Sequence, residues 1–193
     1  MRLFFALWPS QGVRAQFHDW ARMAHADCGG RVLRADTLHL TLVFLGEVDP
    51  ARLGTLLTLM QRTPITPGTL TFDQIGFWSD RKIVWASAAH VPDSLHATRD
   101  ALLSQWQAAG GHIEAQGFRP HVTLLRHARC APADPNPRPL LWTYDTFSLI
   151  QSIRTPRGPH YRRLAPTLDE PPGTDNPERT KSPAPTRQYG IVR

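Results

Sequence analysis

Two short segments of the chain share one pattern of apolar and polar positions. Residues 38–42 (LHLTL) and 120–124 (PHVTL) both alternate, and both read His-x-Thr-Leu. Such alternation is typical of a β-strand with one packed face, because successive side chains of a strand point to opposite sides. Each histidine should therefore share a face with the threonine two positions later.

The first of these strands is expected to separate two environments. Its packed face should carry Leu38, Leu40, Leu42 and Phe44. The opposite face should carry Thr37, His39 and Thr41, and must tolerate polar groups. That polar face is the candidate functional site.

Apolar spacing along the rest of the chain predicts alternating strands and helices. The order is βαβαββαβββ, and the class is α+β. Besides the two motif strands, strands are predicted over residues 2–8, 69–78, 82–88, 143–154 and 160–164. Helices are predicted over 11–26, over 50–60 with Asp49 as the N-cap and Pro50 at the first helical position, and over 92–109.

The two motif strands divide the chain into similar halves, since a long helix precedes each of them. This indicates an internal duplication. From Pro166 onward prolines recur and large apolar residues are nearly absent, so little can be buried. We therefore expect one domain over residues 1–166 and a Pro-rich, disordered tail over 167–193.

The motif is short enough to occur by chance, and a third copy shows this. His96-Ala97-Thr98 also matches, but it lies in a segment with helical periodicity. Residues two apart on a helix do not share a face. We therefore interpret His96 as part of a chance copy.

Charge and cysteine content narrow the class of protein. The formal net charge is +6, and Lys82 and Lys181 are the only lysines, so arginine supplies nearly all of the positive charge. Arginine suits phosphate groups, which favours a polyanionic partner, although an arginine-rich genome would produce the same bias. Cys28 and Cys130 are far apart and indicate neither a metal knuckle nor a disulfide framework.

The expected location is the cytoplasm. The apolar start of the chain ends at Pro9 and is too short for a signal-peptide core. No later run approaches membrane-spanning length. We expect a protein without membrane association.

The chemistry of the polar face follows from its residue types. Two imidazoles form a general acid/base pair, because an unperturbed histidine pKa of about 6.5 allows either protonation state near neutral pH. Threonine hydroxyls beside them can donate hydrogen bonds to an anion. The motifs lack the carboxylate or His-x-x-x-His spacing of a zinc site, and threonine is a poor zinc ligand. We expect neither metal nor cofactor.

These segments resemble the 2H phosphoesterases, which are named for two His-x-Thr motifs. The resemblance is strongest to their bacterial and archaeal RNA 2′,3′-cyclic phosphodiesterase branch, historically called 2′-5′ RNA ligases. It extends over residues 2–7 (RLFFAL), 38–46 (LHLTLVFLG), 118–124 (FRPHVTL) and 148–164. It implies two pseudo-symmetric sheet-and-helix lobes, with the motif strands facing each other across a central cleft.

The resemblance also implies roles for individual residues. His39 would be the proton donor to the leaving 3′ oxygen and His121 the proton acceptor, so that the product carries a 2′-phosphate. Thr41, Thr123 and Arg126 would bind the phosphate. Strand alternation places Arg126 opposite His121, however, unless the strand bulges or ends.

Alternatives remain open at this point. The same pair of histidines would serve a 2′-5′ RNA ligase, a phosphodiesterase for 2′-5′ oligonucleotides or small cyclic phosphates, or a non-catalytic RNA-binding module. In the main interpretation the partner is an RNA or oligonucleotide with a 2′,3′-cyclic phosphate end, and the protein is a monomer. An aromatic side chain should stack on the base, with Phe5, Trp8 and Phe44 as candidates.

Overall fold

The computed structural model describes residues 1–113, 117–156 and 158–165. The tail expected over 167–193 lies outside the described residues.

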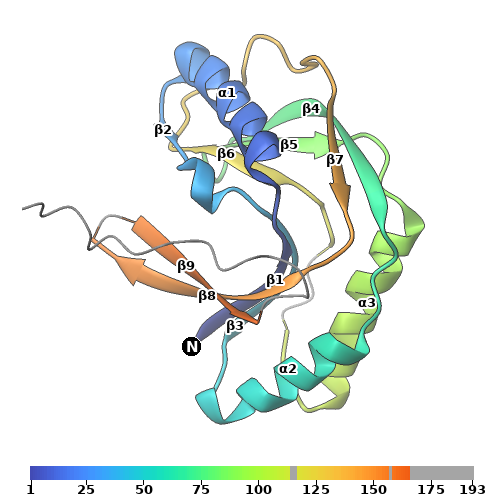
Figure 1. Ribbon diagram of the computed structural model, residues 1–193. Helices are drawn as coiled ribbons and strands as arrows, with labels where there is room; N and C mark the ends of the chain where they lie inside the picture. The colour runs from blue at the N-terminus through green and yellow to red at the C-terminus, as the bar shows by residue number, and fades with distance from the viewer. Residues whose placement is uncertain (114–116, 157, 166–193) are drawn as a thin grey trace, which may run out of the picture.

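The described residues form one antiparallel sheet of nine strands, which is the body of the fold (Figure 1). Its strand order is β7-β4-β5-β6-β3-β1-β8-β9, and the short β2 pairs with β6. The strands are β1 (Arg2–Leu7), β2 (Arg31–Val32), β3 (Leu40–Glu47), β4 (Gly68–Trp78), β5 (Ile83–Ala88), β6 (Val122–Arg126), β7 (Leu140–Tyr144), β8 (Ser148–Thr155) and β9 (Gly158–Ala165).

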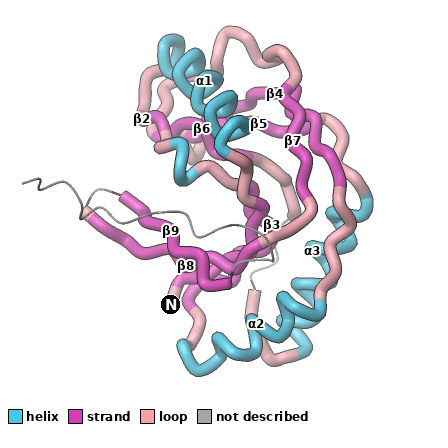
Figure 2. The backbone as a smooth tube through the Cα atoms, in the orientation of Figure 1, coloured by secondary structure: helices cyan, strands magenta, loops and turns pink. Residues whose placement is uncertain are grey.

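Within the described part of the chain, three α-helices pack on this curled sheet. Figure 2 shows their arrangement. Helix α1 (Gln11–Cys28) covers the half that contains β6 and β7, whereas α2 (Leu53–Arg62) and α3 (Asp93–Ala108) lie together beside the other half. Two 3₁₀ turns, η1 (Ala35–Thr37) and η2 (Pro50–Arg52), precede β3 and α2. The α+β class expected from the sequence is confirmed, and the two halves join where β3 pairs with β6.

Helix α1 begins at Gln11 as predicted and ends at Cys28, two residues beyond the predicted end at Ala26. The Ser10 side chain caps the first turn by accepting a hydrogen bond from the Val13 backbone N–H. Gly29 ends the helix at a φ of 61°, a conformation that glycine adopts without strain. The buried face of α1 includes Phe17, which packs edge-on against Phe72 of β4 at a ring-centroid distance of 4.8 Å. This contact fixes α1 on its half of the sheet.

The single strand predicted over residues 143–154 is wrong, because this segment contains parts of two strands. Strand β7 pairs with β4, and β8 pairs with β1, several strands away in the sheet. The chain crosses between them at residues 145–147, where the buried Phe147 packs edge-on against Phe5. Tertiary packing of Phe147 therefore breaks a segment whose local pattern is continuous.

A β-bulge in β3 changes which residues face the polar side. In the pairing of β1 with β3, Ala6 lies opposite Thr41 and Phe5 opposite Val43, so Leu42 is an extra residue. Leu42 and Val43 are both buried in consequence. The prediction that Phe44 packs in the core is wrong, because the bulge turns its ring to the same side as Thr41, where it is 43% exposed.

Strand β6 carries the same irregularity at the matching position. In its pairing with β5, Thr123 lies opposite Trp85 and Leu125 opposite Val84, so Leu124 is the extra residue. Leu124 and Leu125 are both fully buried. Arg126 therefore shares the face of Thr123. Each motif thus presents a third side chain five positions after its histidine.

Candidate active site

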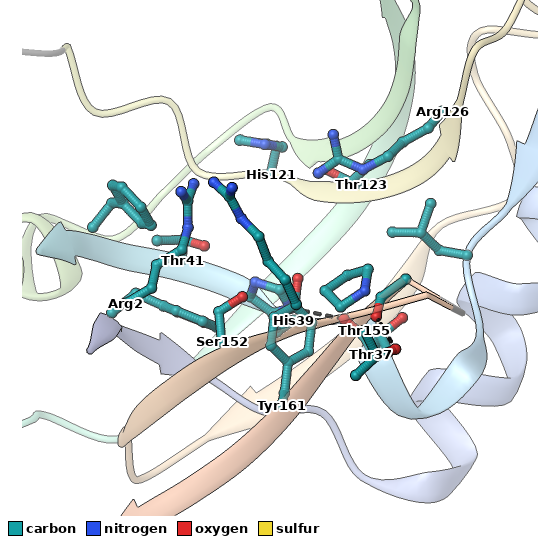
Figure 3. A pocket seen from close by; sticks show the side chains of 16 residues that line it. Arg2, Thr37, His39, Thr41, His121, Thr123, Arg126, Ser152, Thr155 and Tyr161 are labelled. Atoms are coloured by element: carbon teal, nitrogen blue, oxygen red, sulfur yellow. Dashed lines mark hydrogen bonds between the residues drawn. The ribbon is translucent and has the colours of Figure 1, made fainter. Parts of the chain in front are cut away.

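The pairing of β3 with β6 brings the two motifs together. Leu40 lies opposite Val122, and each is the residue directly after a motif histidine. Figure 3 shows the side chains of both motifs around the resulting pocket. The volume of this pocket is about 570 Å³. All five predicted site residues line it, namely His39, Thr41, His121, Thr123 and Arg126.

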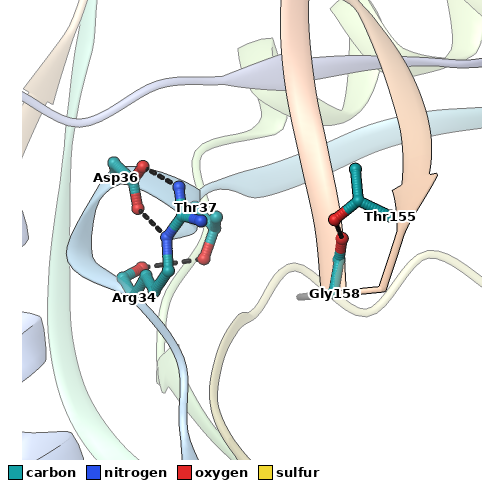
Figure 4. Close-up of polar contacts among 5 residues, drawn as sticks. All are labelled: Arg34, Asp36, Thr37, Thr155 and Gly158. Carbon is teal, nitrogen blue, oxygen red and sulfur yellow. Dashed lines mark hydrogen bonds and ion pairs between the residues drawn. The ribbon is translucent and has the colours of Figure 1, made fainter. Parts of the chain in front are cut away.

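His39 is held in one orientation by a backbone carbonyl. Its Nδ1 lies 2.7 Å from the carbonyl oxygen of Thr37, and since a carbonyl only accepts, Nδ1 carries the proton. Nε2 is thereby left for chemistry in the pocket. Thr37 is itself fixed, because its hydroxyl donates to the Arg34 carbonyl at 2.7 Å, and the Arg34 guanidinium in turn bonds Asp36 (Figure 4).

His121 is held in the same way. Its Nδ1 lies 2.7 Å from the carbonyl oxygen of Arg119, two positions earlier, as Thr37 is two positions before His39. Both imidazoles therefore use Nδ1 for positioning. Each neutral ring keeps an unprotonated Nε2 that can accept a proton, or donate one once it is charged.

Aromatic rings pack against both histidines, three on His39 and one on His121 among the described residues. The His39 ring lies 4.9 Å from the Phe4 ring, 5.4 Å from the Trp8 indole and 5.1 Å from the Tyr161 ring. The Trp78 indole packs edge-on against His121, with centroids 4.6 Å apart. These rings remove water from the imidazoles.

This burial lowers the pKa of both imidazoles. The pKa of His39 falls to about 4, mainly through desolvation, with further lowering by the charges of His121 and Arg126 and an opposing effect of the Thr37 carbonyl. The pKa of His121 is also lowered by burial, and by Arg81 and Arg126. Both rings are therefore neutral at pH 7 in the free protein.

The pocket is strongly cationic. Arg2 and Arg154 line it together with Arg126, and none of the described residues in its lining is a carboxylate. The Arg2 guanidinium lies over the Phe44 ring, 4.7 Å from its centroid. The site is built to receive an anion next to an exposed aromatic face.

The structure separates the three candidates for base stacking. Phe5 is completely buried, so it cannot contact a ligand. Trp8 packs on His39 and does not line the pocket. Phe44 is both exposed and part of the pocket lining. It is therefore the only one of the three with a face available to a base.

Several pocket residues were not singled out from the sequence. They include Arg2 on β1, Ser152 and Arg154 on β8, and Tyr161 on β9. The spacing of Ser152 and Arg154 predicts that they share a face, because residues two apart on a strand point to the same side. It does not place that face at the pocket, since this follows only from the pairing of β8 with β1.

The remaining candidates lie elsewhere. His96, in the third motif copy, is on α3 and packs edge-on against Phe118, as expected for a chance match.

Across residues 1–113, 117–156 and 158–165, no group of three His, Cys, Asp or Glu side chains could hold a metal ion. Among the described helices, none has both the length and the apolar character needed to cross a bilayer.

Comparison with known proteins agrees with this geometry. Residues 7–85 match the family model described as LigT like Phosphoesterase. The chain is 36% identical over 143 residues to the RNA 2′,3′-cyclic phosphodiesterase of Escherichia coli K12, covering 74% of this chain and 81% of that protein. It is 29% identical to the protein of the same name from Thermus thermophilus, covering 85% and 88%.

Solved structures give the same result. The crystal structure of E. coli LigT complexed with 3′-AMP superposes with a TM-score of 0.76 at 34% identity, covering 85% of this chain and 95% of that one. The structure of TT0787 from T. thermophilus superposes with a TM-score of 0.70 at 28% identity, covering 86% and 96%. The chain therefore belongs to the LigT-like phosphoesterases of the 2H superfamily, the family of the curated RNA 2′,3′-cyclic phosphodiesterases.

Proposed function

We propose that this protein hydrolyses terminal 2′,3′-cyclic phosphates of RNA to 2′-phosphates, by metal-independent catalysis with two histidines. The observation that carries the proposal is the matched pair of imidazoles. Both are held through Nδ1 by the carbonyl two residues earlier, which leaves Nε2 for proton transfer, and both residues line one pocket together with Arg2, Arg126 and Arg154. A binding site alone does not require such a pair.

The reaction would proceed in line through phosphorus. Nε2 of His121 takes a proton from water, and the water oxygen forms a bond to phosphorus while the bond from phosphorus to O3′ breaks. Nε2 of His39 donates its proton to O3′, which leaves as a hydroxyl. The phosphate remains on O2′, and proton exchange with solvent restores the starting protonation states.

The lowered pKa values agree with His121 as the base and His39 as the acid, provided that His39 gains a proton when substrate binds. A depressed pKa keeps His121 unprotonated and ready to act as a base near neutral pH. His39, with a pKa of about 4, must gain a proton to act as an acid. An anionic cyclic phosphate between the two rings favours the charged imidazolium, so substrate binding raises the pKa of His39.

Charge that develops on phosphorus needs donors that are already oriented. Thr41 and Thr123 share the pocket face with the histidines and offer hydroxyl groups to the non-bridging oxygens. Arg126 adds a guanidinium, whose fork geometry matches two phosphate oxygens. We assign these three residues to phosphate binding.

The terminal base would stack on Phe44, whose exposed ring lies on the same face of β3 as Thr41. Stacking on an aromatic ring is a general mode of recognising single-stranded RNA.

Since one chain supplies both histidines and all three pocket arginines, we propose an active monomer. The proposed substrates are RNA ends in the cytoplasm.

The names and ligands of the relatives support this assignment. Two curated relatives, from E. coli and T. thermophilus, are named RNA 2′,3′-cyclic phosphodiesterases, and E. coli LigT has been crystallised with 3′-AMP. A ligase or a phosphodiesterase for 2′-5′ linkages would use the same groups, and the direction of the reaction distinguishes them.

The test is hydrolysis of a short RNA with a 2′,3′-cyclic phosphate end, in EDTA. Wild type is compared with His39→Ala and His121→Ala, and with His96→Ala as a matched control from the third motif copy. Loss of either general acid or general base should slow turnover by about 10²-fold to 10⁴-fold. The His96 variant should keep wild-type activity, and the product should carry a 2′-phosphate.

Other outcomes would decide against the proposal. Abolition of turnover by EDTA would contradict the metal-independent mechanism. Binding of the RNA without turnover would support the binding module. Efficient joining when an RNA with a 5′-hydroxyl is added, in preference to hydrolysis, would make the protein a ligase.

A further inference from the structure

The pocket holds more positive charge than one cyclic phosphate requires. Arg2, Arg126 and Arg154 line it, and none of them forms an ion pair within the described parts of the chain. A cyclic phosphate carries one negative charge, and its transition state about two. Arg126 and the protonated acid histidine supply two positive charges to match. Arg2 and Arg154 remain as surplus.

The surplus arginines lie at one end of the pocket, on neighbouring strands. Leu3 of β1 is opposite Gln151 of β8, so Arg2 and Ser152 are the next positions along these two strands. Arg154 is two positions beyond Ser152 and shares its face, and both line the pocket. These three residues, Arg2, Ser152 and Arg154, form a cationic cluster beside the Phe44 ring, over which Arg2 lies.

Of the two surplus arginines, Arg2 lies over the Phe44 ring, and Arg154 is the one whose guanidinium still needs a role. Its side chain is exposed, and within the described residues it has neither a hydrogen bond nor an ion pair. The turn that presents it is closed, because the Thr155 hydroxyl donates to the Gly158 carbonyl at 2.6 Å (Figure 4). The hairpin of β8 and β9 therefore holds at the pocket a guanidinium that has no partner among the described residues.

From this arrangement we propose a second phosphate subsite, in which Arg154, with Ser152 and Arg2, binds the phosphodiester on the 5′ side of the terminal nucleotide. The inference rests on the proposed function. With the cyclic phosphate between the histidines and the base on Phe44, the 5′ oxygen of the sugar points away from the histidines. The next phosphate of an RNA chain then reaches the cluster, and a lone nucleoside cyclic phosphate leaves it empty.

This subsite predicts a preference for chain ends over mononucleotides that depends on charge. Three substrates separate the effects: adenosine 2′,3′-cyclic phosphate, the dinucleotide ApA with a 2′,3′-cyclic phosphate, and the same dinucleotide with a neutral methylphosphonate linkage. Wild type should show a kcat/KM at least about tenfold higher for the diester than for the methylphosphonate, as expected for a charge-assisted hydrogen bond.

The readout for the variants is the ratio of kcat/KM for the diester dinucleotide to kcat/KM for the methylphosphonate. Arg154→Ala should bring it close to one, and Arg154→Lys should preserve part of it. Arg162→Ala is the matched control on the same hairpin, because Arg162 bonds Gln151 and does not line the pocket. Its ratio should equal that of wild type. Thermal unfolding of each variant confirms that the fold is intact.

Three results would overturn the subsite. They are a wild-type ratio near one, a ratio that Arg154→Ala leaves unchanged, and an equal loss on all three substrates, which would place Arg154 on the cyclic phosphate itself. Failure of the proposed function looks different, since wild type would then hydrolyse none of the three, and the subsite proposal would fall with it.

Discussion

The indole of Trp8 lies parallel to the imidazole of His39, with 5° between the planes and 5.4 Å between the ring centroids. Trp8 directly follows β1 and His39 directly precedes β3, and the pairing of these strands places the two rings side by side. Phe4 and Tyr161 also contact the imidazole. This aromatic enclosure explains the desolvation that lowers the His39 pKa to about 4.

Removal of the indole should reverse part of that shift. In Trp8→Ala, water reaches one face of the imidazole, so the pKa of His39 should rise from about 4 toward its unperturbed value. Turnover should fall as well, because the ring is less well positioned. NMR titration of the histidine ring protons measures the pKa directly. Trp78→Ala is the matched control, since Trp78 packs on His121.

In that control, the His121 resonance should shift and the His39 titration should stay as in wild type. An unchanged His39 pKa in Trp8→Ala would show that Trp8 does not cause the desolvation.

Burial of His39 also makes the stability of the fold depend on pH. The folded pKa is about 4 and the unfolded pKa is 6.5, so the unfolded chain binds the proton more readily. Stability is therefore full above pH 6.5 and declines as pH falls toward 4. For a shift of this size the decline is about 2 to 3 kcal/mol in the free energy of unfolding by pH 4.5.

Urea unfolding at pH 7 and pH 4.5 tests this linkage. His39→Gln cannot titrate, so its free energy of unfolding should decline less than that of wild type between the two pH values. His96→Gln should retain the wild-type decline. Equal declines in wild type and His39→Gln would rule out His39 as a source of the pH dependence.

An anion in the pocket should favour the protonated form of His39. Sulfate does not titrate near neutral pH, so any change in its affinity reports the protein. Because sulfate attracts the imidazolium, its dissociation constant should decrease as pH falls from 7 to 5. Isothermal titration calorimetry at several pH values gives this dependence. In His39→Gln the dependence should weaken, and an affinity that is flat with pH in wild type would contradict the prediction.

The strand pattern was sufficient to find the two histidines but not the residues around them. Alternation correctly grouped His39 with Thr41 and His121 with Thr123, because both pairs lie before the bulges. It failed for Phe44, since it does not anticipate the extra residue Leu42. Bulges arise from pairing with a neighbouring strand, and two successive apolar residues in an alternating run are their only local trace.

Long-range pairing limited the rest of the prediction. The break between β7 and β8 has no glycine or proline to mark it, and it exists because the two strands pair with β4 and β1, far apart in the sheet. Arg2 and Arg154 join the pocket only through the second of these pairings. Local sequence therefore identified the chemistry, whereas tertiary pairing determined the pocket lining.

The two matching bulges give Phe44 and Arg126 equivalent positions with different side chains, and this predicts different effects on the substrate. Phe44→Ala should lower kcat/KM for adenosine 2′,3′-cyclic phosphate. The loss should correspond to about 1 to 3 kcal/mol of transition-state binding free energy, the range for base stacking on an aromatic ring. It should lower kcat/KM much less for 1-O-methylribose 2′,3′-cyclic phosphate, which has no base.

Arg126→Ala should instead lower kcat/KM for both compounds to a similar extent, because the phosphate is common to them. Steady-state kinetics on the two compounds measure the contrast, with Phe44→Leu as an intermediate that keeps apolar area but loses the ring. If Phe44→Ala affected both compounds equally, the ring would serve to shape the pocket rather than bind the base. A base-dependent effect of Arg126→Ala would reverse the assignment of the two positions.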